Sequence, residues 1–150
     1  MRDINTECKY QSDLFKYACM MKDCSSLNFV KQFAYSDLAR RMDHESYLYC
    51  GDDVPKAYDS LKKEKKLTVG KEIIPIDIMA WVGYIMRYFS ITKKITTKRV
   101  YQIIKPKELC GLYEAYHSLD NDLVIKRILE SKNVDLSLNN LEVFKKLYKK

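Results

Sequence analysis

Glycine and proline are scarce in this sequence of 150 residues, which contains four glycines and three prolines. β-Sandwiches and barrels need a turn residue about every 8 to 12 positions, so this scarcity argues against an all-β fold. Disorder is excluded as well, because 47% of the residues are hydrophobic. A chain of this length buries roughly 70% of its unfolded surface. We therefore expect one folded domain over residues 1–150 that needs no metal ion or disulfide for its stability.

Long apolar runs are also missing. The longest uncharged apolar stretch, Ile78–Met86, has nine residues and is bounded by Asp77 and Arg87, whereas a membrane span needs about 20. The first 25 residues contain four acidic side chains and no apolar run of the secretory kind. The sequence therefore predicts a cytoplasmic protein without a membrane partner.

Cysteine spacing gives no metal or redox motif. No Cys-x-x-Cys pair is present, and only two histidines accompany the five cysteines: Cys8, Cys19, Cys24, Cys50 and Cys110. Reduced thiols that act as small apolar side chains explain this pattern best. We predict no metal site and no cofactor.

Apolar residues recur at helical spacing through most of the chain. We predict an all-α single-domain bundle of six to seven helices around a central hydrophobic helix at about 76–91, which is apolar on nearly every side. Gly83 lowers the stability of this helix by about 1 kcal/mol relative to alanine. Because a close approach of another helix would explain a glycine at this position, we expect a helix crossing there. Residues 67–74 allow a small hairpin as an alternative. Residues 134–150 are expected to form a loosely attached C-terminal helix.

Positive charge is concentrated in the middle of the chain. The whole sequence carries +7, but residues 56–107 hold 11 lysines and 2 arginines against 4 acidic residues, a net charge of +9. The stretch 90–107 has a helix-turn-helix-like pattern and contributes six cations: Lys93, Lys94, Lys98, Arg99, Lys105 and Lys107. They predict a surface for nucleic acid or for an acidic protein, and a purely solubilising surface is the third explanation.

Aromatic residues gather on three consecutive predicted helices. Tyrosine, tryptophan and arginine are the residues that protein interfaces favour, although core packing is their more frequent role. The candidate partner-binding residues are Trp81, Tyr84, Arg87, Tyr88, Tyr101, Tyr113, Tyr116 and His117.

Catalytic motifs are absent from the sequence. Cys110 and His117 lie two helical turns apart, so their Cα atoms are roughly 10 Å from one another, too far for a direct thiolate–imidazole contact. His117 with Asp120 is an alternative orienting pair. There is no phosphate-binding glycine loop and no run of metal ligands. The prediction is a non-enzyme, with a small enzyme around these three residues as an alternative.

Two segments carry a resemblance to a known group of proteins: Trp-x-Gly-Tyr-x-x-Arg-Tyr at 81–88 and Tyr-His-x-Leu-Asp at 116–120. Over Phe29–Leu129 the chain resembles small uncharacterised bacterial proteins of toxin–antitoxin neighbourhoods, some of them near ADP-ribosyltransferase-like toxins. Neither segment has known chemistry, so no residue role is carried over. The resemblance implies an antitoxin or accessory binder in a bacterial cytoplasm.

Together these features predict a non-enzymatic module that masks a partner protein through an aromatic and basic surface. A regulator that binds nucleic acid through residues 90–107 is the alternative function.

Overall fold

The computed structural model of the chain describes residues 3–44, 53–65, 67, 70 and 72–136. All regular secondary structure among these residues is helical, which confirms the all-α prediction. None of their helices is long and apolar enough to cross a membrane. The described residues form nine helices: α1 (Ile4–Met21), α2 (Ser26–Ala34), α3 (Asp37–His44), α4 (Val54–Glu64), α5 (Ile76–Lys93), α6 (Thr97–Ile103), α7 (Pro106–Gly111), α8 (Tyr113–Tyr116) and α9 (Asn121–Ser131).

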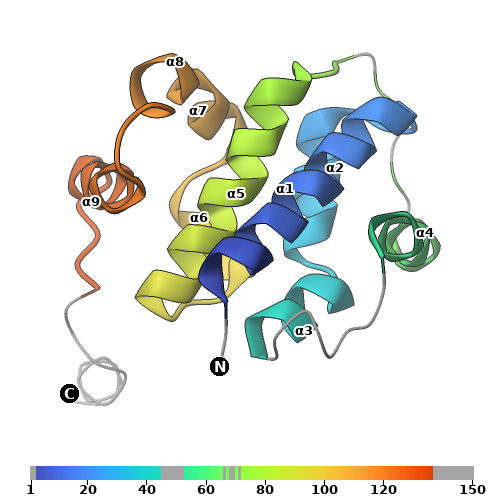
Figure 1. Ribbon diagram of the computed structural model, residues 1–150, viewed down its shortest axis with the longest axis horizontal. Coiled ribbons are helices and arrows are strands. Elements are labelled where there is room, and N and C mark those ends of the chain that lie inside the picture. Colours follow the sequence, from blue (N-terminus) through green and yellow to red (C-terminus); the bar gives the residue numbers. More distant parts are fainter. Residues whose placement is uncertain (1–2, 45–52, 66, 68–69, 71, 137–150) are drawn as a thin grey trace, which may run out of the picture.

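The two longest helices, α1 and α5, lie antiparallel at the centre of the molecule (Figure 1). The predicted central helix is therefore confirmed, and it continues two residues further, to Lys93. A Cβ atom on Gly83 would lie 2.8 Å from the carbonyl oxygen of Gln11 and 2.9 Å from the ring of Phe15. This glycine thus permits the close crossing that the sequence predicts.

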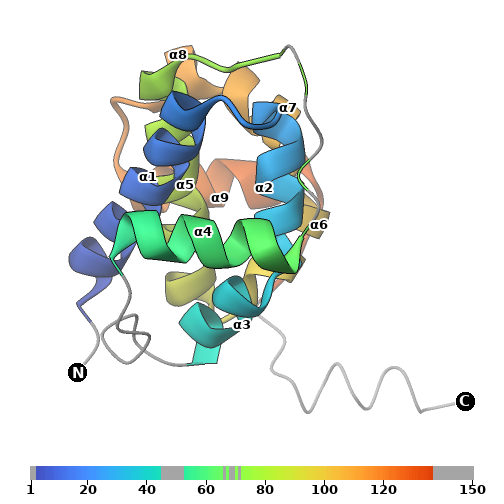
Figure 2. The same cartoon turned by 90° about the vertical axis from the view of Figure 1, so that its right-hand side faces the viewer.

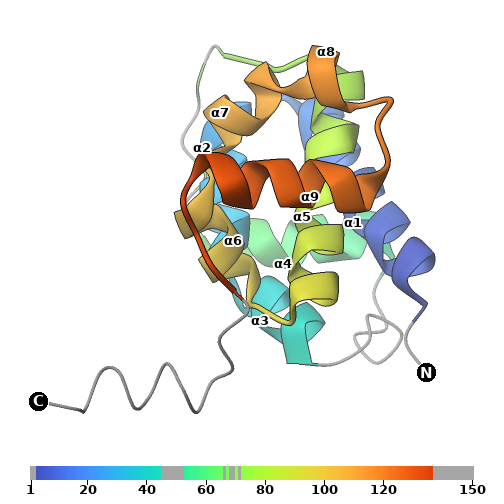
Figure 3. The ribbon, with the colours of Figure 1, turned by 90° about the vertical axis from the view of Figure 1, so that its left-hand side faces the viewer.

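The hydrophobic core fills the space between this helix pair and the helices around it. α4 lies across α1 and α2 on one side of the molecule (Figure 2), and α9 crosses α5 on another (Figure 3). Phe15 packs edge-to-face against Phe29 and Phe33, with ring centroids 5.3 and 5.2 Å away. Tyr58 of α4 closes this aromatic group at 6.0 Å from Phe29. Such edge contacts add to the free energy gained from burial.

The helix count exceeds the predicted six to seven because the helical patterns of the sequence at about 29–42 and 106–116 each form two helices, α2 with α3 and α7 with α8. Ser36 ends α2 by donating to the carbonyl of Phe33 (2.6 Å), and it caps α3 by accepting from the Ala39 N–H (3.1 Å). The second division falls at Leu112, directly after Gly111, which is a weak helix former.

Two other predictions concern segments that the structure describes only in part. In 67–74, the described residues contain no strand, and 68–69 and 71 lie outside the described part. The Ser26 N–H donates to the Glu72 carbonyl (3.1 Å), and the Ile74 N–H donates to the Ser26 hydroxyl (2.9 Å). These bonds fasten Glu72 and Ile74 to the start of α2. For the predicted helix at 134–150, residues 137–150 lie outside the described part.

Candidate functional site

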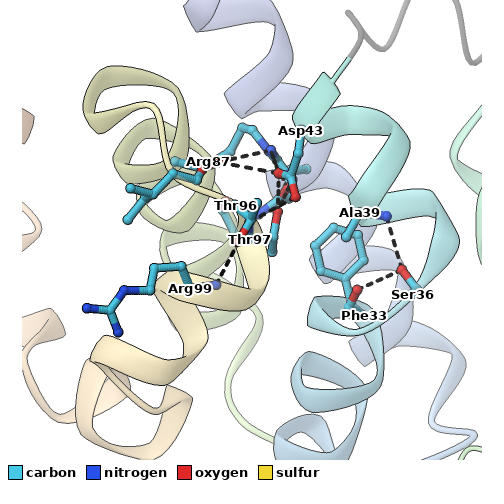
Figure 4. A network of polar contacts seen from close by, with 12 residues as sticks. Phe33, Ser36, Ala39, Asp43, Arg87, Thr96, Thr97 and Arg99 are labelled. Atoms are coloured by element: carbon cyan, nitrogen blue, oxygen red, sulfur yellow. Dashed lines mark hydrogen bonds and ion pairs between the residues drawn. The ribbon is translucent and has the colours of Figure 1, made fainter. Parts of the chain in front are cut away.

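A buried arginine is the centre of a network of hydrogen bonds between helices. Arg87 of α5 is 0% exposed, and its Nη1 donates to Asp43 Oδ1 at 2.8 Å (Figure 4). Its Nε donates to the side-chain oxygen of Gln11 and its Nη2 to the hydroxyl of Thr97, both at 2.7 Å. The pairing explains how a charge is accommodated in the interior, since an unpaired buried ion costs several kcal/mol.

Arg87 was predicted to face a partner, and that prediction is wrong. The helix around it is apolar on nearly every side, so a side chain at this position points inward whatever its chemistry. The sequence does contain the signal: a cation in the apolar middle of a buried helix has to find a buried acceptor. The sequence does not reveal which carboxylate supplies it, because Asp43 is 44 positions away.

Asp43 fixes the start of α6 as well as the arginine. Its Oδ2 accepts from the backbone N–H of Thr97 (3.0 Å), and its Oδ1 accepts from the hydroxyl of the same residue (2.7 Å). Its side chain is only 7% exposed. Asp43 thereby joins α3, α5 and α6, and Gln11 adds α1 to the network.

A pocket of about 370 Å³ adjoins this network, between α3 and the start of α6. We call it the α3–α6 pocket. It is lined by Ala34, Tyr35, Ser36, Arg40, Asp43, His44, Thr96 and Lys98.

Two tyrosines separate this pocket from a second one. Tyr35 of the first pocket meets Tyr101 edge-to-face, with ring centroids 5.8 Å apart. Lys98 Nζ lies 5.3 Å from the ring centre of Tyr35, and Lys105 Nζ lies 4.4 Å from that of Tyr101. The second pocket, about 270 Å³ and here called the α2–α7 pocket, is lined by Leu27, Asn28, Lys31, Tyr101, Lys105, Pro106 and Lys107.

These side chains form one continuous candidate site over α2, α3, α6 and α7. Asp43 contributes a carboxylate, but Arg87 neutralises it. On α3, Asp37 forms ion pairs with Arg40 and Arg41. The basic tyrosine surface, as we call this site, consists of Lys31, Tyr35, Arg40, His44, Lys98, Tyr101, Lys105 and Lys107.

The structure divides the predicted basic stretch between different parts of the molecule. Lys98, Lys105 and Lys107 belong to the basic tyrosine surface, and Arg99 is exposed beside them on α6. Lys93 instead lines an open pocket with Lys126 of α9. Lys94 ends α5 in a left-handed conformation with φ of 57°. The sequence did not predict the other half of this surface, because its residues on α2 and α3 lie far from 90–107 along the chain. These residues are Lys31, Tyr35, Arg40 and His44.

The predicted aromatic partner surface is likewise divided. Trp81 meets Tyr113 edge-to-face at 5.8 Å, and Tyr113 stacks on His117 at 4.3 Å, so these three lie together. Tyr116 packs against Arg127, whose guanidinium lies 5.9 Å from the ring centre. Tyr101 belongs to the basic tyrosine surface instead.

The remaining two tyrosines of that set fasten helices to one another. The Tyr84 hydroxyl donates to Asn5 of α1 (2.7 Å), and the Tyr88 hydroxyl donates to Asp122 of α9 (2.6 Å). Both side chains are half-buried. Their hydrogen bonds therefore give them a packing role between elements.

The hydrogen bond of Tyr88 to Asp122, with some burial, raises the pKa of Tyr88 to about 12 from its usual 10. The stability that this bond gives is complete below pH 10 and is lost as the pH rises toward 12. We expect Tyr88→Phe to lower the free energy of unfolding at pH 8 by at most about 1 kcal/mol, since water screens a half-exposed contact. The difference from wild type should disappear by pH 12 in urea titrations, and a constant difference would contradict the assignment.

His117 and Asp120, two of the three residues of the alternative enzyme site, form hydrogen bonds within their own segments. His117 Nδ1 lies 2.6 Å from the Tyr113 carbonyl, and Asp120 accepts from the Asp122 N–H (3.0 Å) as the cap of α9. Burial raises the pKa of Cys110 to about 11, so its thiol is protonated at neutral pH and is a poor nucleophile. In the described part of the chain, no hydrogen bond joins two of His117, Asp120 and Cys110.

The described cysteines, Cys8, Cys19, Cys24 and Cys110, are free thiols. Cys50 lies outside the described residues. Within the described ranges, no three His, Cys, Asp or Glu side chains are grouped so that they could hold a metal ion.

No family model, curated protein or solved structure matches this chain. The resemblance of residues 29–129 to proteins of toxin–antitoxin neighbourhoods therefore stays a prediction. What the chain binds has to be inferred from the charge, exposure and contacts of its own residues.

Proposed function

We propose that the protein is a non-enzymatic binding module and that its basic tyrosine surface covers an acidic face of a partner protein. The observation that carries this proposal is the Tyr35–Tyr101 pair, which has lysines over its rings and a cation-lined pocket on each side. A toxin in the bacterial cytoplasm is the partner that the family resemblance implies.

The chemistry of this surface suits protein recognition. Tyrosine rings supply rigid contact area at a small entropic cost, and they are enriched where interfaces gain most of their energy. The lysines around them would attract an acidic partner over several ångströms and speed its association. The ammonium groups of Lys98 and Lys105 already lie over the two rings, so these side chains have fewer rotamers left to lose on binding.

Removing the cations tests the proposal. The experiment is a pull-down from an extract of the cells in which the protein naturally occurs, and the partner is the protein that the wild type retains. We expect the triple variant Lys98→Gln, Lys105→Gln, Lys107→Gln to retain at least tenfold less of this partner. The matched control, Lys9→Gln, Lys63→Gln, Lys126→Gln, removes the same charge from exposed positions on α1, α4 and α9. Equal losses in the two variants would mean that net charge, and not this surface, attracts the partner.

A second candidate function, nucleic-acid binding, is favoured by the connection between α5 and α6. Only three residues, 94–96, separate these helices, as in a helix-turn-helix motif. α6 exposes Lys98, Arg99 and Gln102. About five phosphate contacts would give a log–log salt slope near −4 to −5 on duplex DNA. Affinity that does not change between low and physiological salt would exclude this function.

A further inference from the structure

The α3–α6 pocket has the size and chemistry of a small-ligand site. Its volume of about 370 Å³ falls within the range of roughly 300 to 1,000 Å³ that is usual for such sites. Arg40 and His44 are one turn apart on α3, so their side chains share a face of the helix. Lys98 reaches the same pocket from α6. Two elements thus bring nitrogen donors to one cavity.

The charge of the pocket is positive although a carboxylate lines it. Asp43 is neutralised by Arg87, and its two oxygens accept from Arg87 and Thr97. Arg40 forms an ion pair with Asp37, but these side chains are 67% and 49% exposed. An ion pair in contact with water contributes little, so Arg40 can exchange this carboxylate for a ligand oxygen at small cost.

Two further side chains suit a phosphorylated ligand. Thr96 Oγ1 accepts from the Arg99 N–H (3.1 Å), which leaves its own hydrogen free to be donated (Figure 4). Tyr35 is 40% exposed on the wall of the pocket and offers an aromatic surface. Base stacking on such a ring is a common source of affinity for nucleotides.

We propose that the α3–α6 pocket binds a phosphate monoester, with the phosphate between Arg40, His44 and Lys98 and the group that it esterifies against Tyr35. A phosphate dianion accepts several charge-assisted hydrogen bonds at once, which matches donors that arrive from two helices. The proposal adds a ligand site to the binding module and does not depend on which macromolecule the module recognises. The monoester has two sources, a free nucleotide or the 5′-phosphate that ends a nucleic-acid strand.

Isothermal titration calorimetry with AMP and with adenosine tests the site. AMP should bind with a stoichiometry of one, and adenosine should bind at least tenfold more weakly, because it lacks the phosphate. Lys98→Gln should weaken AMP binding about tenfold through the loss of one charge-assisted contact. The variant Lys105→Gln, Lys107→Gln leaves this pocket intact and should bind AMP as the wild type does, even where it no longer retains the partner protein.

A second titration compares a short single strand that carries a 5′-phosphate with the same strand that carries a 5′-hydroxyl. A preference of at least tenfold for either phosphorylated ligand supports the site, and the tighter of the two identifies its source. Equal binding of phosphorylated and unphosphorylated ligands would overturn the proposal, as would an unchanged affinity in Lys98→Gln. Absence of binding by every ligand would overturn it as well.

Discussion

Arg87→Met should lower the free energy of unfolding by about 3 to 5 kcal/mol, because it leaves the carboxylate of Asp43 buried without its cation. Methionine replaces the aliphatic stem of arginine but not its guanidinium, so the single substitution removes the charge together with some packing, and the double-mutant cycle separates the two effects. Equilibrium urea titration of the two proteins, followed by far-UV circular dichroism, measures it.

A double-mutant cycle gives this experiment its control. Asp43→Leu alone leaves the guanidinium uncompensated and should cost a similar amount. The double variant Arg87→Met, Asp43→Leu buries no charge and should be far more stable than the sum of the two losses predicts. Additive losses, or a loss below about 1 kcal/mol for Arg87→Met, would show that the pair does not interact in the interior as described.

Gly83→Ala should destabilise the protein by about 1 to 3 kcal/mol, although alanine is the better helix former by about 1 kcal/mol. The new Cβ would lie 2.8 Å from the Gln11 carbonyl oxygen and 2.9 Å from the Phe15 ring. A backbone carbonyl cannot move aside alone, so α1 would have to shift away from α5. Thermal unfolding and urea titration would both report the loss.

Gly111→Ala is the matched control for this substitution. Gly111 also belongs to a helix, but a Cβ atom there would meet nothing within 4 Å. Its replacement should leave stability unchanged or raise it by up to about 1 kcal/mol. Stabilisation by both substitutions would mean that α1 and α5 are not in close contact at Gly83.

The central helix could be predicted because its evidence is local in sequence. The apolar stretch 78–86 and the apolar residues on nearly every side of 76–91 predict a buried helix, and a glycine in its middle costs stability unless another helix approaches it. The division at Ser36 could not be predicted in the same way. A serine inside a helical pattern either faces outward or caps a new helix, and here the Phe33 carbonyl and the Ala39 N–H decide between these roles.

The candidate site was only half predictable for a related reason. Lys98, Tyr101, Lys105 and Lys107 stand out because they cluster within ten residues. Tyr35 and its neighbours on α2 and α3 carry no such signal, since only the packing of α2 against α6 brings them beside that cluster. The residue type of Arg87 is typical of an interface, but its helix is interior, so its position and not its chemistry determines its role.

The anchoring of α6 links the basic tyrosine surface to the interior of the protein. α6 has seven residues, too few for a helix to persist alone in water. Its first turn is fastened by Asp43, which also compensates Arg87. The face that a partner would meet and the charge at the centre therefore form and melt as one cooperative unit. Thr97 and Gln11, which are buried in this network, are therefore expected to hold the basic tyrosine surface in place although they are not part of it.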